Sequence, residues 1–336
     1  MKIKYKAPLI MFMCTLVMTS VSAYVGYRSN LKLINSGMEM ELHTVSTILQ
    51  NDIQIKASNA AARASLVANF PPVQEALKAH DRDQLIKLVV PAFLIQKEKF
   101  GVVDGHFHYP PAVSFLRTFA LQKWGDDLST SRELVLQANK KLTPLQGIEI
   151  STTGVSIKGI DIVKDENGPI GSLEVGVGFN SLLQELQDNT GFDSAAFIDE
   201  NMLTKIATAA PKGDPDRIIG GFRTWATTDW AKIHAVVNPE ILNKVTDLTY
   251  KIETINGQFV GVVLVPLLDF RGVQIGSIVA VKNFDNYQRQ LLGNLLTSIA
   301  LALLQIIIIV GLNFIIFNVW LVSNDAPVES VPVKKE

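Results

Sequence analysis

The chain has 336 residues, of which 48% are hydrophobic and 19% are charged, and its formal net charge at pH 7 is -1. Because no segment carries a dominant stripe of lysine and arginine, the composition argues against a nucleic-acid-binding surface. The one cysteine, Cys14, excludes an intrachain disulfide, a thiolate zinc site, an iron–sulfur cluster and covalently attached haem.

Residues 7–27 form an uncharged apolar run that follows three lysines and stops at Arg28. About 20 apolar residues span a bilayer core, so the run predicts a first transmembrane helix. A cleaved signal peptide is the alternative, since a lysine-rich start, an apolar middle and the small residues of Val21-Ser22-Ala23 also fit that pattern. The helical pattern that continues directly after Arg28 favours the uncleaved helix.

Residues 28–68 are expected to form one long helix that ends before Pro71 and Pro72. Apolar residues recur every three or four positions along it and make one stripe: Ile34, Met38, Leu42, Val45, Leu49 and Ile53. A helix of this kind commonly pairs with a copy of itself, so we expect a homodimer in which Met38, Leu42, Val45 and Leu49 lie near the contact. The alternative is that the stripe packs only on its own domain.

The next region is expected to be rich in strands. Asn167-Gly168 separates two alternating runs, and Asn256-Gly257 separates two more. Asn-Gly between alternating runs is a strong hairpin signal, so antiparallel sheets are predicted.

An internal repeat divides this region in two. Ile170-Gly-Ser-Leu173 recurs 105 residues later as Ile275-Gly-Ser-Ile278. Three more positions match at the same offset: Phe179 with Phe284, Asn180 with Asp285, and Leu186 with Leu291. In both copies a last strand is expected to run into a helix capped by Asn180 or Asp285. The repeat predicts two tandem α+β modules of similar topology.

Residues 290–324 form a second uncharged run, which as a helix would be about 50 Å long and therefore more than spans a bilayer core. Asn313 and Asn318 inside it are expected either to face a partner helix or to lie near the headgroups. Two spans place both termini on one side of the membrane, and the lysines before the first span favour the cytoplasmic side.

Several short motifs occur in order along the first module: His106-Phe-His-Tyr-Pro-Pro-Ala-Val-Ser-Phe-Leu-Arg117, Gly125-Asp-Asp-Leu-Ser129, Arg132, Gly147-Ile-Glu149 and Ile170-Gly-Ser-Leu-Glu174. With these motifs the chain resembles, over about residues 28–291, the double Cache sensor domains of bacterial chemoreceptors and sensor kinases. The resemblance implies a long N-terminal helix, two PAS-like modules and flanking membrane helices, with ligand held by the membrane-distal module. The chain departs from the family pattern at Lys158, where Arg is frequent. It also has only a short tail after Asn324, where chemoreceptors and sensor kinases continue into a HAMP and an output domain.

The predicted fold class is therefore α+β, with a long N-terminal helix and two tandem PAS-like (Cache) modules with antiparallel sheets, flanked by two transmembrane helices. The expected segments are residues 7–27 for the first transmembrane helix, 28–70 for the long helix, 71–180 for the membrane-distal module, 181–288 for the membrane-proximal module, 291–323 for the second transmembrane helix and 324–336 for a cytoplasmic tail.

Polar side chains of the distal module are expected to bind a small anionic or zwitterionic organic ligand, because Arg can grip a carboxylate and a protein carboxylate can meet an amine. The candidate residues are His106, His108, Arg117, Arg132, Glu149, Lys158 and Glu174. As alternatives, Arg117 pairs with Asp126 or Asp127 to fasten a loop, the two histidines are satisfied strand residues, and residues 126–129 only begin a helix. Residues 222–225 and Trp230 are interpreted as exposed loop packing, with a second pocket as the alternative.

The sequence contains no Ser-His-Asp order, P-loop, dinucleotide motif or metal motif, so neither an enzyme, a cofactor nor a metal site is expected. The expected function is an extracytoplasmic small-molecule sensor, anchored by two spans in the cytoplasmic (inner) membrane. It is expected to work as a homodimer and to signal through its membrane helices to a separate cytoplasmic or membrane signalling protein. The alternative is a ligand-binding or adaptor subunit of a receptor or transport complex.

Overall fold

The computed structural model describes residues 3–211, 213–243, 245, 247–255 and 257–324, which form two compact units. One unit contains the described residues up to Met38 and from Phe284 onward, and the other runs from Glu39 to Asn283.

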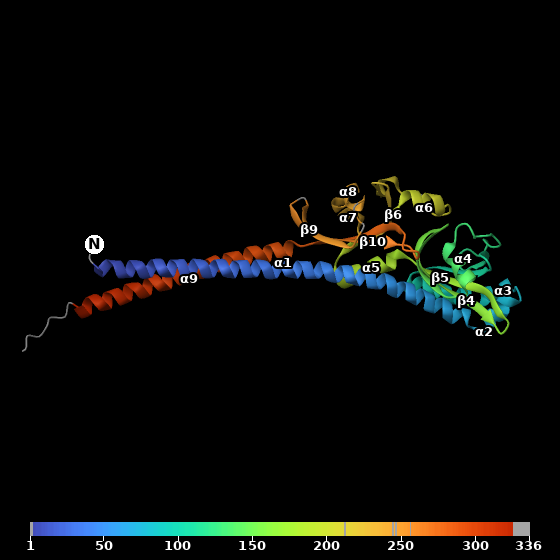
Figure 1. Ribbon diagram of the computed structural model, residues 1–336, viewed down its shortest axis with the longest axis horizontal. Coiled ribbons are helices and arrows are strands. Elements are labelled where there is room, and N and C mark those ends of the chain that lie inside the picture. The colour runs from blue at the N-terminus through green and yellow to red at the C-terminus, as the bar shows by residue number, and fades with distance from the viewer. Residues whose placement is uncertain (1–2, 212, 244, 246, 256, 325–336) are drawn as a thin grey trace, which may run out of the picture. The chain divides into compact units, whose positions relative to one another are not determined.

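The helices, labelled in part in Figure 1, are α1 (Ile3–Ala68), α2 (Pro71–Lys78), α3 (Arg82–Phe100), α4 (Glu133–Lys141), α5 (Phe179–Thr190), α6 (Glu200–Ile206), α7 (Trp230–Val236), α8 (Pro239–Asn243) and α9 (Asp285–Asn324), with a 3-10 turn at Pro215–Arg217. The strands are β1 (Val102–Tyr109), β2 (Val113–Arg117), β3 (Leu145–Ser151), β4 (Gly154–Asp165), β5 (Gly168–Val177), β6 (Asp193–Asp199), β7 (Ile218–Ile219), β8 (Phe222–Thr227), β9 (Thr249–Ile255), β10 (Gln258–Leu268) and β11 (Gln274–Asn283).

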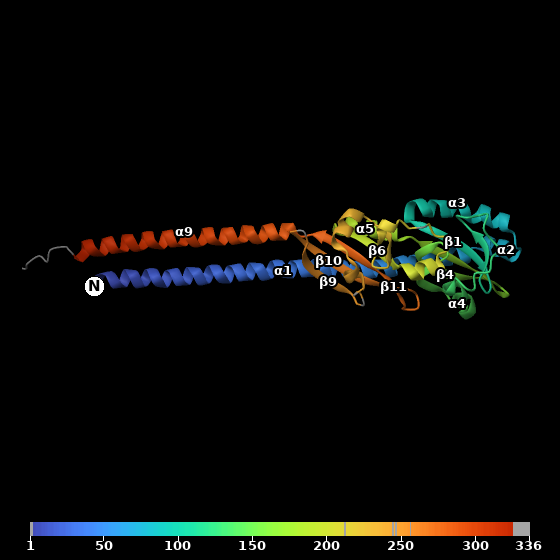
Figure 2. The same cartoon turned by 90° about the horizontal axis from the view of Figure 1, so that it is seen from above.

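The first unit consists of the beginning of α1 and the whole of α9. Both views show the two helices side by side, and Leu16 and Ile309 line the same crevice between them (Figures 1 and 2). Within the described residues, Asp285–Ile316 is a stretch long and apolar enough to cross a membrane. Residues 7–27 are helical as the beginning of α1, and their membrane span stays a prediction. The predicted tail after residue 324 lies outside the described residues.

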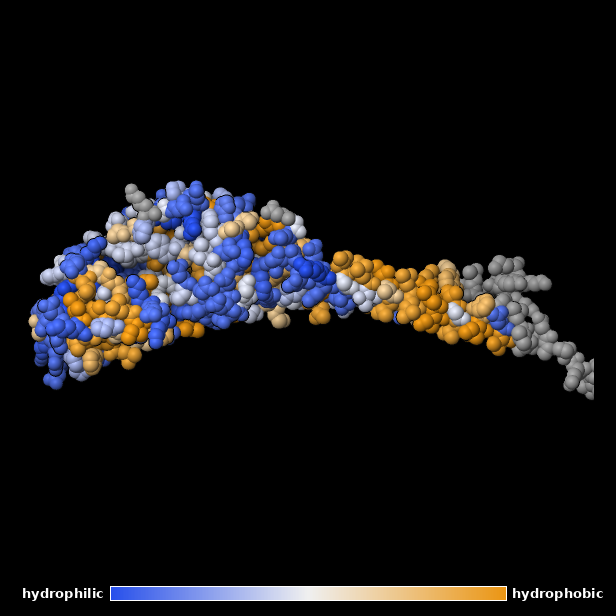
Figure 3. All heavy atoms as spheres, turned by 180° about the vertical axis from the view of Figure 1, so that it is seen from behind, coloured by the Kyte–Doolittle hydropathy of each residue, from blue (hydrophilic) through white to orange (hydrophobic). Residues whose placement is uncertain are grey.

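Apolar side chains cover most of the outer surface of these two helices (Figure 3). Asn313 of α9 donates its side-chain N–H to the carbonyl of Ile309 one turn earlier, at 2.9 Å. The amide therefore has a partner within its own helix.

The second unit contains two antiparallel sheets with the same strand order. The first sheet has the order β2-β1-β5-β4-β3, and the second has the order β7-β8-β6-β11-β10-β9. Apart from the short β7, each strand of the second sheet has a counterpart at the same place in the first. The repeated segments Ile170–Glu174 and Ile275–Val279 lie in β5 and β11, which are the central strands of the five that correspond. The predicted pair of modules with similar topology is confirmed, whereas the predicted segment boundaries are not tested.

Local sequence explains how these elements begin and end. β4 and β5 form the hairpin expected at Asn167-Gly168, with Asp165 paired to Gly168, while Asn256 of the second expected hairpin lies outside the described residues. The helix α2 begins at Pro71, where proline is favoured because the missing N–H has no intrahelical partner. The predicted cap at Asn180 is wrong, because α5 already begins at Phe179 with Gly178 at its N-cap and no side-chain cap.

The apolar stripe of α1 packs on the rest of its own chain. Met38, Leu42, Val45 and Leu49 are each at most 2% exposed. Further along, Ala60, Ala64 and Ala68 join the core formed by α2, α3 and one face of the first sheet, which includes Phe107, Leu173 and Val175. The predicted location of a dimer contact at these four stripe residues is therefore wrong, because their side chains are already covered within one chain.

Candidate functional site

The opposite face of the first sheet carries a buried polar cluster, to which most of the predicted site residues contribute. Side chains point alternately to the two faces of a strand, so every second residue of β1, β4 and β5 reaches the same face. Six of the seven predicted residues lie on this face or at the start of α4 beside it, and each is at most 4% exposed: His106, His108, Arg132, Glu149, Lys158 and Glu174.

Arg132, the residue that precedes α4, joins two strands of the sheet. Its Nε donates to Glu149 Oε2 at 3.1 Å, and its Nη2 donates to Glu174 Oε2. Glu149 also accepts the backbone N–H of Leu134 at 2.8 Å, so the carboxylate fixes the first turn of α4. The expected helix start at residues 126–129 is wrong by several residues, since α4 begins only at Glu133.

Lys158 is the second cation of the cluster and is completely buried. Its Nζ lies 2.9 Å from Glu174 Oε1, 3.4 Å from Glu149 Oε2 and 4.0 Å from Asp104 Oδ2. The single ammonium group is therefore shared among three carboxyl groups.

The charges of this network stabilise one another. Burial alone would raise the pKa of Glu174, but the nearby charges of Arg132 and Lys158 outweigh burial and hold the pKa well below its usual range. Burial opposes the charge of Arg132, but the Glu174 and Glu149 carboxylates raise its pKa above the usual value. Burial and the negative charge of Glu174 raise the pKa of Asp104, which shares Lys158 with two closer carboxylates.

The two histidines are stacked on the same face, with ring centroids 3.9 Å apart, as expected for strand residues two positions apart. His106 Nε2 lies 2.8 Å from Ser114 Oγ of the neighbouring strand β2. Burial is the largest cause that lowers the pKa of both imidazoles. For His106 the next cause is the neighbouring His108, and its pKa lies well below the ordinary value. For His108 the next cause is the positive charge of Arg132, and its pKa is lowered to about 3. Both rings are therefore neutral at neutral pH.

His108 and Ser172 are polar groups without hydrogen-bond partners in the described part of the chain. Both ring nitrogens of His108 and the hydroxyl of Ser172 are buried and unpaired, and the two residues are paired across β1 and β5. Buried polar atoms are nearly always hydrogen-bonded, so these atoms at adjacent positions have donor and acceptor capacity that the described residues leave unused.

Arg117 does not join the cluster. Its guanidinium makes two hydrogen bonds with the Asp126 carboxylate, at 2.8 and 2.7 Å, and a third with the carbonyl of Lys123. Asp126 belongs to the loop between β2 and α4, and its backbone carbonyl accepts the N–H of Ser114. Arg117 thus fastens this loop, in agreement with the structural alternative considered from the sequence, and its predicted role in ligand binding is not tested.

The polar residues of this face that were missing from the sequence prediction include Asp104, Ser114 and Ser172. Asp104 precedes His106 and His108 by the same two-residue step, so strand alternation was a signal for it. Ser172 lies inside the Gly-Ser-Leu-Glu motif two positions before Glu174. No sequence signal pointed to Ser114, because its partner His106 depends on how β1 and β2 are aligned.

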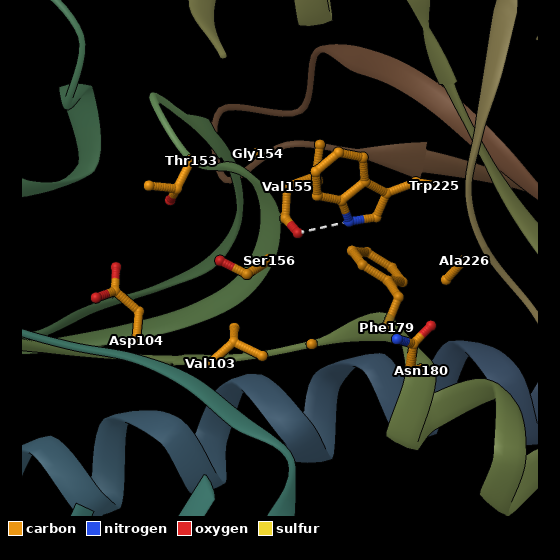
Figure 4. A pocket seen from close by; sticks show the side chains of 11 residues that line it. Val103, Asp104, Thr153, Gly154, Val155, Ser156, Phe179, Asn180, Trp225 and Ala226 are labelled. Carbon is orange, nitrogen blue, oxygen red and sulfur yellow. Dashed lines mark hydrogen bonds between the residues drawn. The ribbon is translucent and has the colours of Figure 1, made fainter. Parts of the chain in front are cut away.

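Two cavities lie at the two ends of the cluster. Asp104 lines one of about 250 Å³, together with Trp225 of β8 (Figure 4), and Glu149 lines another of about 380 Å³ together with Arg271. The interpretation of Trp225 as exposed loop packing is wrong, because the residue lies on a strand and its ring contacts the first module. Within the residues that the structure describes, no group of three or more His, Cys, Asp or Glu side chains is arranged to hold a metal ion.

Known proteins with similar sequences or folds were then compared with the chain. The solved structures that are similar to it include the ligand-binding domain of the Campylobacter jejuni chemoreceptor Tlp3 in complex with 4-methylisoleucine and the periplasmic domain of Vibrio cholerae LuxQ. The Tlp3 domain is 13% identical with a TM-score of 0.46, and the match covers 78% of this chain and 94% of that one. The LuxQ domain is 9% identical with a TM-score of 0.42, and the match covers 71% and 98%. No curated protein matches the chain.

A family model described as the double sensory domain of two-component sensor kinase matches residues 38–285. The match includes both sheets, the polar cluster of the first module and residues 38–68 of α1. It confirms the resemblance to double Cache sensor domains that the motifs indicated. The chain therefore belongs to this double Cache family of sensory domains.

Proposed function

We propose that this protein is a membrane-anchored extracytoplasmic sensor that binds a small polar organic molecule on the buried face of its first sheet. The observation that carries the proposal is the pair of unsatisfied groups at His108 and Ser172. A neutral imidazole offers one donor and one acceptor, and a hydroxyl offers both. The ligand would therefore carry a donor and an acceptor on adjacent atoms, such as an amide, a carboxylic acid or a hydroxylated carbon chain.

The charge network narrows the nature of this ligand. Arg132 and Lys158 already have carboxylate partners in Glu149 and Glu174. A purely anionic ligand would have to displace one of these carboxylates and strand it in a buried site, which costs several kcal/mol. A zwitterionic or neutral polar ligand does not have this cost, so of the two classes expected from the sequence we retain the zwitterionic one.

Access to this face would require movement of the loop between β2 and α4. Its residues are held over the sheet by backbone hydrogen bonds from Ser114 to Asp126 and from Leu128 to Ala112, and by the Arg117–Asp126 pair. The loop is held by separate hydrogen bonds and ion pairs rather than by a continuous ladder like that of the strands beneath it, so its opening should cost less than separating those strands.

Signalling would proceed through α1 and α9, the helices that continue from the second unit (Glu39–Asn283), called the sensory unit below. The central strand β11 is followed directly by α9, so a small shift of β11 would be transmitted to the apolar stretch Asp285–Ile316. We further propose that residues 7–27 form the first of two membrane spans, that both termini are cytoplasmic, and that the output is carried by a separate protein.

A homodimer also remains part of the proposal, with a different contact from the one expected. The apolar side chains of α1 that are exposed within the sensory unit are Met40, Ile55 and Leu66, which are 54–76% exposed. Figure 3 shows an apolar area at the end of this unit where α2 and α3 lie. Leu94 and Ile95 of α3 are also exposed apolar residues of this unit. These residues, rather than the buried stripe, are available to a second copy.

The binding proposal is tested by a ligand screen with a matched pair of variants. The full-length protein in detergent is screened by thermal unfolding against small zwitterionic and neutral polar metabolites, since a ligand that binds the native state raises the melting temperature. Ser172→Val removes one hydroxyl from the proposed site. Ser277→Val makes the same change at the equivalent position of the second module, where the hydroxyl is also buried and unpaired.

Both variants should change the melting temperature of the free protein to a similar extent, because each replaces one buried, unpaired hydroxyl by two methyl groups. Ser172→Val alone should weaken ligand binding, by about 10-fold for one lost hydrogen bond to a buried group. The proposed site would be refuted if both variants weakened ligand binding equally, or if neither variant changed it.

A further inference from the structure

The cavity beside Asp104 lies between the two modules and is separate from the His108 and Ser172 pair. Its walls come from the beginnings of β1 and β4, the end of β5, the first turn of α5 and the strand β8 of the second sheet (Figure 4). Its volume of about 250 Å³ is below the range of roughly 300–1,000 Å³ that holds drug-sized ligands. It is suited to a small molecule.

The lining combines one carboxyl group with neutral polar groups and aromatic rings. Asp104 contributes the carboxyl group, Ser156 a hydroxyl and Asn180 an amide, while Phe179 and Trp225 contribute rings. No Lys, Arg or His is among the described residues that line this cavity. Figure 4 shows Asp104 on one side of the cavity and the rings of Phe179 and Trp225 on the other, with Ser156 between them. A carboxylate attracts an organic ammonium group, and the aromatic rings offer faces on which the carbon atoms of the same ligand can pack.

The charge network behind the cavity leaves Asp104 poorly neutralised. Three carboxyl groups, those of Asp104, Glu149 and Glu174, share the two cations Arg132 and Lys158. The Lys158 ammonium nitrogen lies 4.0 Å from an Asp104 carboxyl oxygen but 2.9 Å from a Glu174 carboxyl oxygen. Its positive charge therefore stabilises the Asp104 carboxylate less than the Glu174 carboxylate. When all three are ionised the network has one uncompensated negative charge, at the one carboxyl group that faces the cavity.

The aromatic wall is held in place by the first module. Trp225 donates its Nε1–H to the carbonyl of Val155 at 2.9 Å. Its ring packs so closely on Gly154 that a Cβ there would lie 2.0 Å from the ring. The indole is therefore positioned beside the cavity before any ligand binds, and the cost of ordering it on binding is small.

We infer that this cavity is a second binding site, for a small organic ammonium compound whose charged group pairs with Asp104 and whose other end points across the cavity toward Ser156 and Trp225. A hydroxyl on the ligand would suit the neutral polar wall formed by Ser156 and Asn180. The inference goes beyond the proposed function, since it does not require a ligand at His108 and Ser172. A ligand in this cavity would touch β1 and β4 of one module and β8 of the other, and would thus bias how the two modules pack.

The test uses ethanolamine as the probe and full-length protein in dodecyl maltoside, which contains no amine. Binding is followed by tryptophan fluorescence, with Trp225→Phe to assign the signal, and ethylene glycol is the control without a charge. Asp104→Asn should weaken ethanolamine binding about 10-fold or more, since a hydrogen bond to a charged group is replaced by a neutral one. Asp127→Asn changes the net charge equally on an exposed loop and should leave binding unaffected.

A second measurement does not depend on the variants. Because the pKa of Asp104 is raised in the free protein, pairing with an ammonium group should release protons from the fraction of Asp104 that is protonated. Calorimetry of wild-type protein at pH 5 in two buffers of different ionisation enthalpy measures this release. Saturable ethanolamine binding that is lost in Asp104→Asn, with proton release and no effect of Ser172→Val, supports the inference. Absence of binding, equal binding of ethylene glycol, or loss in Ser172→Val but not in Asp104→Asn overturns it without bearing on the zwitterion screen.

Discussion

The substitution of Lys158 by methionine tests whether the buried cluster behaves as one charge-balanced unit. Lys158 is completely buried and its ammonium group lies within 4.0 Å of three carboxyl groups. Lys158→Met fills a similar volume with apolar atoms but leaves Glu149 and Glu174 with Arg132 as the one remaining cation. Breaking a buried ion pair by removing one partner typically costs about 3–5 kcal/mol, because the other charge is stranded.

Removing a carboxylate as well as the lysine should restore part of the lost stability. Glu174→Gln alone removes the carboxylate that contacts both cations. It leaves Arg132 and Lys158 with Glu149 and with Asp104, which lies 4.0 Å from Lys158, so it should also cost about 3–5 kcal/mol. The double variant Lys158→Met/Glu174→Gln retains the Arg132–Glu149 pair and restores the balance of charge. It should be more stable than the sum of the single losses implies, with an interaction energy of about 2 kcal/mol or more.

Thermal unfolding of the full-length protein in detergent, followed by near-ultraviolet circular dichroism, measures these differences. For a unit of this size, 1 kcal/mol corresponds to roughly 2–4 °C, so each single variant should melt about 6–20 °C below wild type. The double variant should recover a large part of that loss. Single variants within about 2 °C of wild type, or a double variant whose loss equals the sum of the two, would refute the description of the cluster as a closed ionic network.

Two further predictions concern the loop and the dimer. Arg117→Ala should lower stability by about 1–2 kcal/mol, because the bidentate pair is strong in geometry but Asp126 is half exposed. The Arg117 hydrogen bond lowers the pKa of Asp126 below its ordinary 3.8, so this contribution is present above that pH and is lost as the pH falls through the lower folded-state value. Melting curves of wild type and Arg117→Ala should therefore converge in acid, and a constant difference down to pH 2 would contradict this assignment. In a Cys14→Ser background, cysteine at Leu66 should cross-link in membranes whereas cysteine at buried Leu49 should not, and the opposite result would restore the original contact.

Strand alternation made the polar face predictable from the sequence. His106 and His108 are two residues apart, and this period places both rings on one face whatever the tertiary structure is. The repeat of Ile170–Leu173 likewise predicted matching central strands, because a repeated sequence folds into a repeated topology. Local periodicity was sufficient for these features.

Pairing partners were not predictable in the same way. The sequence offered both Asp126 and a ligand as partners for Arg117, and only the path of the following loop decides between them. The stripe on α1 was equally suited to a second copy or to the chain's own sheets. Trp225 illustrates the same limit, since its contact with Gly154 joins residues that are 71 positions apart. Contacts over such separations depend on how the modules dock, which leaves no periodic signal.

The second module supplies an internal comparison that bears on why the first module carries charges. Through the repeat and the strand pairing, the positions of His106, Lys158 and Glu174 correspond in the second sheet to Ala195, Val262 and Val279. All three of these residues lie in the apolar core of the second module.

The same topology thus forms with an apolar core at the places where the first module has a cation, a carboxylate and an imidazole. Burying charges confers little net stability compared with well-packed apolar residues of similar volume. The fold therefore does not require the polar cluster, and its cost in desolvation is accounted for if the cluster recognises a ligand. Ser172 supports the same reasoning from the opposite side, since Ser277 repeats its hydroxyl without the neighbouring histidine and charges. The second module also has buried unpaired hydroxyls, at Ser194, Thr224, Thr227 and Ser277, whereas in the first module Ser172 is paired across the sheet with His108, whose two ring nitrogens are unpaired as well.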